Sequence, residues 1–256
     1  LSCGLKDIGL NQSDKVVVCG DNRPHLYFAM TAVQAAGGIP VPVYQDSVAE
    51  EMEYIYDHAE ARFSIVENQE QVDKILEIKD RIPALEHVIY KDARGLRNYK
   101  QDFLHNYAGI QKRGQAYDER DPSFYPNSIT SQTGNDTSIM LYTSGTTGRP
   151  KGVMLSYSNM IATGKNCSEL EGLNQNDNML AYLPMAWIGD NIFSHAQSYV
   201  TGYCVNCPES SETVLEDLRE IGPTYFFAPP RIFENILTSV MIRIEDAAIW
   251  KQRMFH

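Results

Sequence analysis

Short apolar runs alternate with amphipathic segments along most of this chain, and this alternation restricts the possible folds more than any other feature. Runs such as residues 15–20 (KVVVCG) and 62–67 (RFSIVE) are rich in Val and Ile, which favours buried strands. Between such runs, the segment 68–83 repeats apolar residues at helical spacing and ends at a proline. Strands that alternate with helices build a mostly parallel sheet with helices on its faces. The chain is therefore predicted to be an α/β protein.

The alternation is interrupted over residues 91–135. This stretch is polar and rich in turn residues, so it is expected to be a connecting region and the internal boundary. We therefore expect a first α/β subdomain together with the connecting region at 1–135, and a second α/β subdomain at 136–256. The strands expected beyond residue 135 are 138–144, 178–185, 203–207 and 224–230, and the expected helices are 156–170, 189–202, 211–222 and one long helix from 231 onward.

Charge and hydropathy exclude several classes of protein. The 256 residues carry a net charge of −11, which disfavours a general nucleic-acid binder, because such proteins contact phosphates through clustered Lys and Arg. No apolar run approaches the ~20 residues that span a bilayer, and no signal peptide is visible at the start. The chain begins without Met and ends inside a helical pattern, so we expect it to be part of a longer polypeptide.

The five cysteines are an odd number at irregular spacing, which favours reduced thiols in a cytosolic protein over a disulfide framework. Cys204 and Cys207 have the spacing of a redox or zinc pair. A redox pair usually opens a helix, whereas this pair lies on an expected strand that runs into Pro208. A zinc site needs more ligands than these two thiols supply. A structural role for both thiols is therefore preferred.

The stretch 141–152 (LYTSGTTGRPKG) places glycines, hydroxyl residues and cations directly after an apolar strand. It predicts the order strand, glycine-rich loop, helix, which directs backbone N–H groups and a helix N-terminus at an anion. The glycines permit backbone angles that let successive amides point inward. Several charge-assisted hydrogen bonds of about 1.5–3 kcal/mol each would hold a polyphosphate. The predicted binding residues are Thr143, Ser144, Gly145, Thr146, Thr147, Gly148 and Lys151.

Two common phosphate motifs do not fit this stretch. A Walker A loop requires a second glycine that is followed by Lys and then Ser or Thr. Counting from Gly145, the second glycine position is Pro150, and Lys151 is followed by Gly152. The spaced glycines of the dinucleotide fingerprint are absent as well. A phosphate-loop NTPase is therefore disfavoured, and the stretch is a phosphate loop of another kind.

The longer string LYTSGTTGRPKGV closely resembles the signature loop of the adenylate-forming (AMP-binding) enzymes, the superfamily of acyl-CoA synthetases, luciferases and nonribosomal adenylation domains. Two later strings, AYLPMAWIGDNIFSHAQSYVTGYCV and VLEDLREIGPTYFFAPPRIFENI, resemble a region of the long-chain fatty acid:CoA ligases, in which Pro223–Thr224 and Pro230–Arg231 match the family pattern. Trp187 stands where many relatives carry His, and Asp190 where they carry Glu. These departures leave the acyl preference open.

The resemblance implies an N-terminal large-domain portion of such an enzyme, with mostly parallel sheets flanked by helices in two similar subdomains. The family's adenine, magnesium and ribose motifs and its C-terminal small domain are not found in these residues. The catalytic residues therefore stay unknown, and the isolated chain is expected to be inactive.

The resemblance also implies a reaction. A long-chain fatty acid would attack ATP to give an acyl-adenylate and pyrophosphate, and the thiol of CoA would then release AMP and give acyl-CoA. The expected small molecules are the fatty acid, ATP, Mg²⁺ and CoA as co-substrate, with Thr146 near Mg²⁺. Trp187 and Asp190 are expected at the acyl tunnel, although an ordinary core Trp is an equal alternative for Trp187.

Other interpretations stay open. The parent protein could activate another carboxylate, for example one loaded onto a carrier protein, or the chain could be a non-catalytic, truncated nucleotide-binding homologue. His195 could form a dyad with Asp190, although a core or surface histidine is favoured, and Arg231 could organise the nucleotide side or cap a helix. No nucleic-acid partner is expected. The expected location is the cytoplasm, with peripheral membrane contact and the oligomeric state left open.

Overall fold

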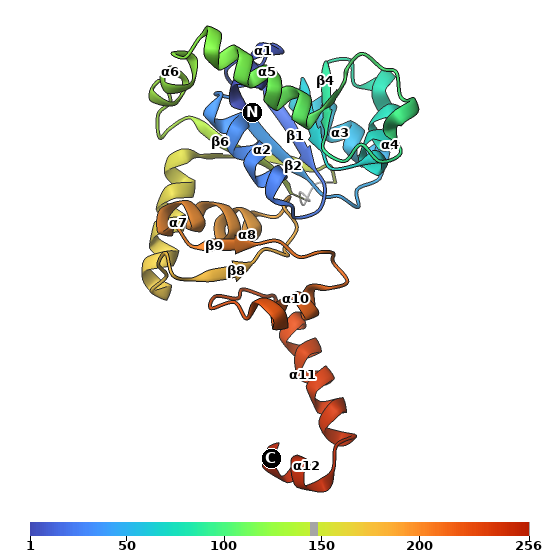
Figure 1. Ribbon diagram of the computed structural model, residues 1–256, viewed down its shortest axis with the longest axis vertical. Helices are drawn as coiled ribbons and strands as arrows, with labels where there is room; N and C mark the ends of the chain where they lie inside the picture. Colours follow the sequence, from blue (N-terminus) through green and yellow to red (C-terminus); the bar gives the residue numbers. More distant parts are fainter. Residues whose placement is uncertain (144–147, 256) are drawn as a thin grey trace.

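Five parallel strands form one sheet in the first half of the chain, in the order β2-β1-β3-β4-β5 (Figure 1). The computed structural model describes residues 1–143 and 148–255. The predicted α/β class and its parallel pairing are confirmed. The strands are β1 (Lys15–Cys19), β2 (Ile39–Val43), β3 (Phe63–Val66), β4 (His87–Tyr90) and β5 (Leu104–Asn106).

Both faces of this sheet are buried, as its apolar strands require. Successive side chains of a strand point to opposite faces, and β1 shows the result: Val16 and Val18 belong to one core cluster, Val17 and Cys19 to another. Helices complete each cluster. The helices over the first are α1 (Ser2–Asp7), α2 (Pro24–Ala35) and α5 (Tyr107–Arg120), and those over the second are α3 (Ala49–Ala59) and α4 (Gln69–Ile78).

Residues 91–135, expected to be a connecting region, instead hold β5, α5 and α6 (Phe124–Thr130). The buried residues of α5 are Tyr107, Ile110 and Gly114, which lie at helical spacing and pack toward α1. Most other positions of this helix are polar. Because the packed face is narrow, the polar majority conceals the helix in the sequence.

The second half begins with an antiparallel hairpin of β6 (Thr137–Thr143) and β7 (Lys151–Ser156). β6 packs against β2 and adds Met140 and Tyr142 to the core cluster of β2, α3 and α4. The helix expected at 156–170 is confirmed as α7 (Tyr157–Glu171), but β7, which was not expected, lies between it and the glycine-rich loop. The predicted order of strand, loop and helix is therefore wrong. The order is strand, loop, strand, because the residues after the loop pair with β6.

The remaining elements lie below the first sheet in the view of Figure 1, and α11 extends away from them. β8 (Asn178–Leu180) and β9 (Cys204–Asn206) form a short parallel pair. The strand expected at 224–230 contributes one bridge, between Met179 and Tyr225. The helices are α7 (Tyr157–Glu171), α8 (Ile188–Asp190), the π-helical segment η3 (Asn191–Ala196), α9 (Gln197–Thr201), α10 (Val214–Ile221), α11 (Pro230–Glu245) and α12 (Ile249–Phe255), and the 3₁₀ turns are η1 (Lys79–Arg81) and η2 (Leu96–Asn98).

The long helix expected from residue 231 onward is divided. α11 ends at Glu245 and α12 starts at Ile249. No residue of α11 is buried, so tertiary packing, the main source of helix stability in proteins, does not reinforce the helix across 246–248. None of the helices in the described ranges combines the length and the apolar character needed to cross a membrane.

Gly4 and Gly114 lie where α1 and α5 cross, and they allow a test of this packing. A Cβ atom on Gly4 would lie 2.1 Å from the backbone oxygen of Ile110, and one on Gly114 would lie 2.7 Å from the backbone nitrogen of Gly4. Gly4→Ala or Gly114→Ala should therefore lower the free energy of unfolding by about 1–3 kcal/mol, because the two helices must move apart. Urea titration measures this change.

Gly109→Ala is the matched control on α5. A Cβ atom there would meet nothing within 4 Å, so the change should be neutral or should raise the free energy of unfolding by about 0.5–1 kcal/mol. Equal losses in Gly109→Ala and Gly4→Ala would show that close packing of α1 on α5 is not what these glycines provide.

Candidate functional site: a glycine-rich loop and an adjoining cleft

The glycine-rich loop joins β6 to β7, and the structure describes its two flanks. Thr143 and Lys151 are paired at the loop end of the hairpin, and both are exposed. Gly148 has a φ of +107°, and no atom of the described residues lies within 4 Å of a Cβ placed there. The flanks therefore present a hydroxyl and a cation at an open position. The other predicted binding residues lie outside the described part of the chain: Ser144, Gly145, Thr146 and Thr147.

Helix α3 contacts both flanks of the loop. Tyr54 donates its hydroxyl hydrogen to the carbonyl oxygen of Pro150 (2.9 Å), and the Arg149 guanidinium lies 5.6 Å from the centre of the Tyr54 ring. One helical turn further, Nδ1 of His58 is hydrogen-bonded to the hydroxyl of Tyr142 (2.7 Å). Sequence reasoning missed Tyr54 and His58. Their spacing on one face of a helix, next to other core positions, is the only local signal of this role.

The charges at the loop suit an anion. Arg149 and Lys151 are exposed, and no carboxylate among the described residues forms an ion pair with either. Such uncompensated cations are notable in a chain with a net charge of −11. They attract phosphate oxygens both through their charge and as hydrogen-bond donors.

The described residues do not build a magnesium site. They contain no group of three or more His, Cys, Asp or Glu side chains placed to hold a metal ion. Thr146, the residue expected near Mg²⁺, lies outside the described residues.

A cleft of about 360 Å³ lies between the two halves of the chain. It opens at the carboxyl ends of β1 and β2, which is where open parallel sheets bind their ligands. Residues 20–23 and 43–46 line it from the first half, and Tyr182, Met185 and Val214 are among those that line it from the second. Sequence analysis did not predict this cleft, because its walls come from segments that are far apart in the chain.

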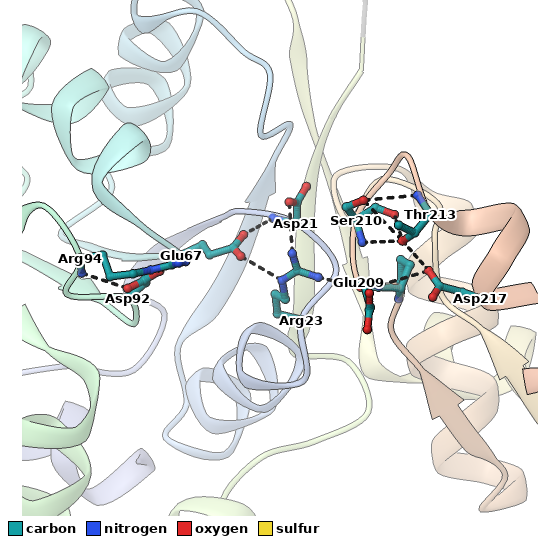
Figure 2. Close-up of polar contacts among 10 residues, drawn as sticks. Asp21, Arg23, Glu67, Asp92, Arg94, Glu209, Ser210, Thr213 and Asp217 are labelled. Carbon is teal, nitrogen blue, oxygen red and sulfur yellow. Dashed lines mark hydrogen bonds and ion pairs between the residues drawn. The ribbon is translucent and has the colours of Figure 1, made fainter. Parts of the chain in front are cut away.

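Arg23 connects the two sides of the cleft (Figure 2). Its Nε atom donates to Oε1 of Glu67 (2.9 Å), just after β3, and its Nη1 atom donates to the carbonyl oxygen of Pro208 (2.7 Å) in the second half. The backbone N–H of Asp21 donates to the other carboxylate oxygen of Glu67 (2.7 Å). The guanidinium therefore ties the ends of β1 and β3 to the segment that follows β9.

Hydrogen bonds at the start of α10 order the facing wall in Figure 2. The hydroxyl of Thr213 and the backbone N–H of Glu209 both donate to the same carboxylate oxygen of Asp217, at 2.8 Å and 3.2 Å. The backbone N–H of Ser210 donates to the Thr213 hydroxyl (3.0 Å). The segment after Pro208 is therefore a compact turn held onto α10, and it forms a defined wall of the cleft.

Trp187 is half-buried beside an aromatic cluster. Its ring centre lies 6.3 Å from that of Phe227, which stacks on Phe193 at 3.9 Å. The indole covers Gly189, since a Cβ there would lie 1.9 Å from the ring atom Cζ3. Because residue 189 is a glycine, the indole can occupy the space that a larger side chain there would fill. The assignment of Trp187 to an acyl tunnel stays a prediction.

Asp190 and His195 lie in the same helical run but do not form a dyad. Among the residues that the structure describes, no hydrogen bond joins them: Tyr27, Asn22 and Ser194 donate to Asp190, and Nε2 of His195 is without a partner. Burial lowers the pKa of His195 to about 4, so its ring is neutral near pH 7. His195 is therefore a core histidine, one of the two alternatives favoured over a dyad. Asp190 is fully buried, and its place at an acyl tunnel stays a prediction.

The cysteine pair forms no site within the described ranges. Cys204 is exposed, Cys207 is half-buried, and both thiols are free. Burial raises the pKa of Cys207 to about 12, which keeps its thiol neutral and weakly nucleophilic. Arg231 is exposed in the first turn of α11.

Comparison with known proteins identifies the family. The AMP-binding enzyme family matches residues 1–251. A long-chain-fatty-acid–CoA ligase of Xenopus laevis is 31% identical over 241 residues, which cover 91% of this chain and 32% of that protein. A second such ligase, of Bos taurus, is 28% identical over 260 residues, which cover 98% of this chain and 35% of that protein. The chain therefore spans about a third of the length of the curated relatives it matches.

The fold is shared with solved structures. The crystal structure of a long-chain-fatty-acid–CoA ligase from Archaeoglobus fulgidus matches with a TM-score of 0.73 at 19% identity, over 96% of this chain and 45% of that one. Likeness at this level of identity shows the fold alone. The family match shows more than the fold, because the matched residues include the hairpin, the residues that line the cleft and the aromatic cluster. The chain belongs to the AMP-binding enzyme family.

Proposed function

We propose that this chain is part of an ATP-dependent long-chain fatty acid:CoA ligase and supplies the site for the pyrophosphate end of ATP. The observation that carries the proposal is the pair of exposed, uncompensated cations Arg149 and Lys151 beside the glycine-rich loop of an AMP-binding enzyme. The relatives named as long-chain-fatty-acid–CoA ligases support the substrate class. The halves on either side of the cleft are proposed as two subdomains with a boundary near residue 135.

The proposed first step is an in-line displacement at phosphorus. The fatty acid carboxylate attacks the α-phosphorus of ATP, the bond from that phosphorus to the bridging oxygen breaks, and pyrophosphate leaves with the electron pair. Negative charge grows on the leaving phosphates, and Lys151 together with the donors of the loop stabilises it. In the second step the thiol of CoA attacks the acyl carbonyl, and AMP leaves.

The hairpin alters how this stabilisation is supplied. A strand follows the loop, so among the described residues no helix N-terminus directly succeeds the loop to direct its dipole at the phosphates. Cationic side chains and the donors of the loop must therefore carry the electrostatic effect. The contact of Tyr54 with Pro150 contributes by holding the backbone before Lys151 in place.

The acyl group is proposed to lie against Trp187. The ring of Trp187 is half-buried, and it adjoins Phe227 and Phe193. Aromatic side chains offer a large apolar surface to a hydrocarbon chain. The indole would then limit how much of the acyl chain the site accepts.

Lys151→Ala in the full-length protein tests the phosphate-holding role. It should lower the rate of fatty-acid-dependent ATP–pyrophosphate exchange roughly tenfold to a hundredfold, because a charge-assisted hydrogen bond of about 1.5–3 kcal/mol is lost. Thr146→Ala should also slow exchange. Lys165→Ala, at an exposed lysine of α7, is the matched control and should leave the rate within about twofold of the wild type.

Unchanged exchange in both Lys151→Ala and Thr146→Ala would refute the phosphate-holding role. Adenylate formation without transfer of the acyl group to CoA would instead favour an enzyme that loads another acceptor. ATP hydrolysis that needs no carboxylic acid would contradict the ligase function itself.

Gly189→Ala in the full-length protein tests the role of Trp187. The added methyl group takes the place of part of the indole, so the ring must swing away while the loop and its cations are untouched. The ratio of kcat/KM between long-chain and medium-chain acids should change by at least about threefold, with the KM for ATP unchanged. Gly109→Ala, at an open position of α5, is the control. An equal loss for every chain length would mean that Trp187 is an ordinary core residue.

A further inference from the structure

Asp190 is a fully buried carboxylate that accepts several hydrogen bonds. Tyr27 donates its hydroxyl hydrogen to the carboxylate (2.8 Å to Oδ2, 3.0 Å to Oδ1), Ser194 donates at 2.7 Å, and Nδ2 of Asn22 donates at 3.4 Å. Within the described part of the chain, no Lys, Arg or His forms an ion pair with it. Neutral donors alone therefore stabilise this buried charge.

These bonds join the two halves of the chain. Tyr27 and Asn22 lie in and just before α2, whereas Asp190 ends α8 and Ser194 lies in η3. Asn22 also donates to the carbonyl oxygen of Leu183 (2.8 Å) and to the hydroxyl of Tyr27 (2.8 Å). Asp190 is thus the centre of a polar contact that spans the boundary between the halves.

A second contact lies one turn further along α2. The hydroxyl of Thr31 is hydrogen-bonded to the hydroxyl of Tyr199 on α9. The helical run 188–201 therefore touches α2 near both of its ends. The contact at Asp190 is buried, whereas the contact at Tyr199 is exposed.

Asn191, the residue after Asp190, connects this contact to the backbone of Trp187. The side-chain amide of Asn191 donates to the carbonyl oxygens of Met185 (2.8 Å) and Trp187 (2.9 Å). Leu183 is held from the first half by Asn22. Hydrogen bonds therefore hold the segment 183–191 along its length. Asn22 binds its start at Leu183, Asn191 binds its middle, and Tyr27 binds its end at Asp190.

Ionising Asp190 in this place costs stability. Burial raises the pKa of Asp190 from its usual value of 3.8 to about 7, against the opposing effect of the bonds from Ser194 and Tyr27. A raised pKa means that the folded chain holds this proton more tightly than the unfolded chain, so stability falls as the pH rises through that interval. An Asn would fill nearly the same volume without this cost. A carboxylate here therefore favours a role that uses its charge.

Asp190 is the group of this cluster that titrates near neutral pH. Burial raises the pKa values of the surrounding tyrosines, raises that of Cys207 to about 12, and lowers that of His195 to about 4. None of these groups changes its charge between about pH 6 and about pH 8. The titratable groups that face Asp190 are Tyr27 on α2 and, on either side of β9, Tyr203 and Cys207. Beyond them lie the ring of His195, next to Tyr27, and the cation of Arg23, next to Cys207.

We propose that Asp190 is a positioning residue for the acyl substrate: the bond that it accepts from Tyr27 holds residues 183–191, and with them Trp187, against α2. The ionised carboxylate gives the tighter acyl site, because a hydrogen bond to a charged acceptor is stronger than one to a neutral carboxyl group. This role rests on the proposed ligase function and on a Trp187 that contacts the acyl chain.

Asp190→Asn and Tyr27→Phe in the full-length protein test this role. ATP–pyrophosphate exchange would be followed from about pH 6 to about pH 8 with a medium-chain fatty acid that stays monomeric. The wild-type KM for the acid should rise roughly threefold or more as the pH falls across this range, and Asp190→Asn should remove the dependence, because its amide does not titrate. Titration of the substrate itself is common to both proteins and cancels in the comparison.

Tyr27→Phe removes the donor from the first half. The KM for the fatty acid should rise roughly threefold to tenfold, while the KM for ATP stays the same, because the loop is untouched. Tyr125→Phe makes the same change at an exposed tyrosine of α6 and is the matched control, with both KM values unchanged.

Thermal unfolding separates this role from damage to the fold. The midpoint for Asp190→Asn should exceed that of the wild type at about pH 8, and the difference should shrink as the pH falls toward 3.8, below which the carboxyl group is protonated in the folded and the unfolded chain alike. A variant whose midpoint is not lowered but whose KM for the acid is altered would support positioning.

The outcomes distinguish this inference from the proposed function. A wild-type protein that exchanges pyrophosphate with fatty acids, together with variants whose KM values and pH profiles are unchanged, would overturn the role of Asp190 alone. A wild-type protein that shows no exchange with any fatty acid would overturn the proposed function first and this role with it. Equal increases in the KM for ATP and for the acid would show that the contact is only structural.

Discussion

A parallel sheet that is buried on both faces is the constraint on which the rest of the structure depends. β1 can be apolar along nearly its whole length only because helices cover both sides of the sheet. Strands that run in the same direction end at the same edge, so the loops after β1 and β2 meet there and line the cleft. β6 adds its own side chains to the same core. The glycine-rich loop therefore starts from a strand that is fixed to the sheet.

The predictability of each element follows from how it is packed. β1, β3 and β4 are readable in the sequence because their apolar runs are uninterrupted and end at turn residues. α5 is not, because it buries only Tyr107, Ile110 and Gly114. β7 is not readable either, because residues 151–156 are partly or fully exposed and follow a proline and two turn-forming glycines. Pairing with β6, a tertiary effect, decides their conformation.

The candidate site divides in the same way. The loop is one contiguous string, so its spacing and its resemblance to a family could be evaluated directly. The bond from Arg23 to Pro208 joins residues that are far apart in the chain and leaves no local pattern. Asp190 is a further case: its identity is visible in the sequence, but its burial and the hydrogen bond from Tyr27 depend on the packing of the second half against α2. Sequence reasoning could name this residue but not its partners.

The π-helical segment η3 sets the angular phase of the helical run 188–201. Tyr199 follows Asp190 by about two and a half turns of an ideal α-helix, which would direct the two side chains to opposite sides. A π turn rotates the chain less per residue than an α turn, and η3 lies between them. The wider turn thus brings both residues toward one neighbour, where Asp190 meets Tyr27 and Tyr199 meets Thr31. The extra residue of the π turn changes the direction in which Tyr199 points relative to Asp190. If it were removed, only one of the two contacts with α2 could form at a time.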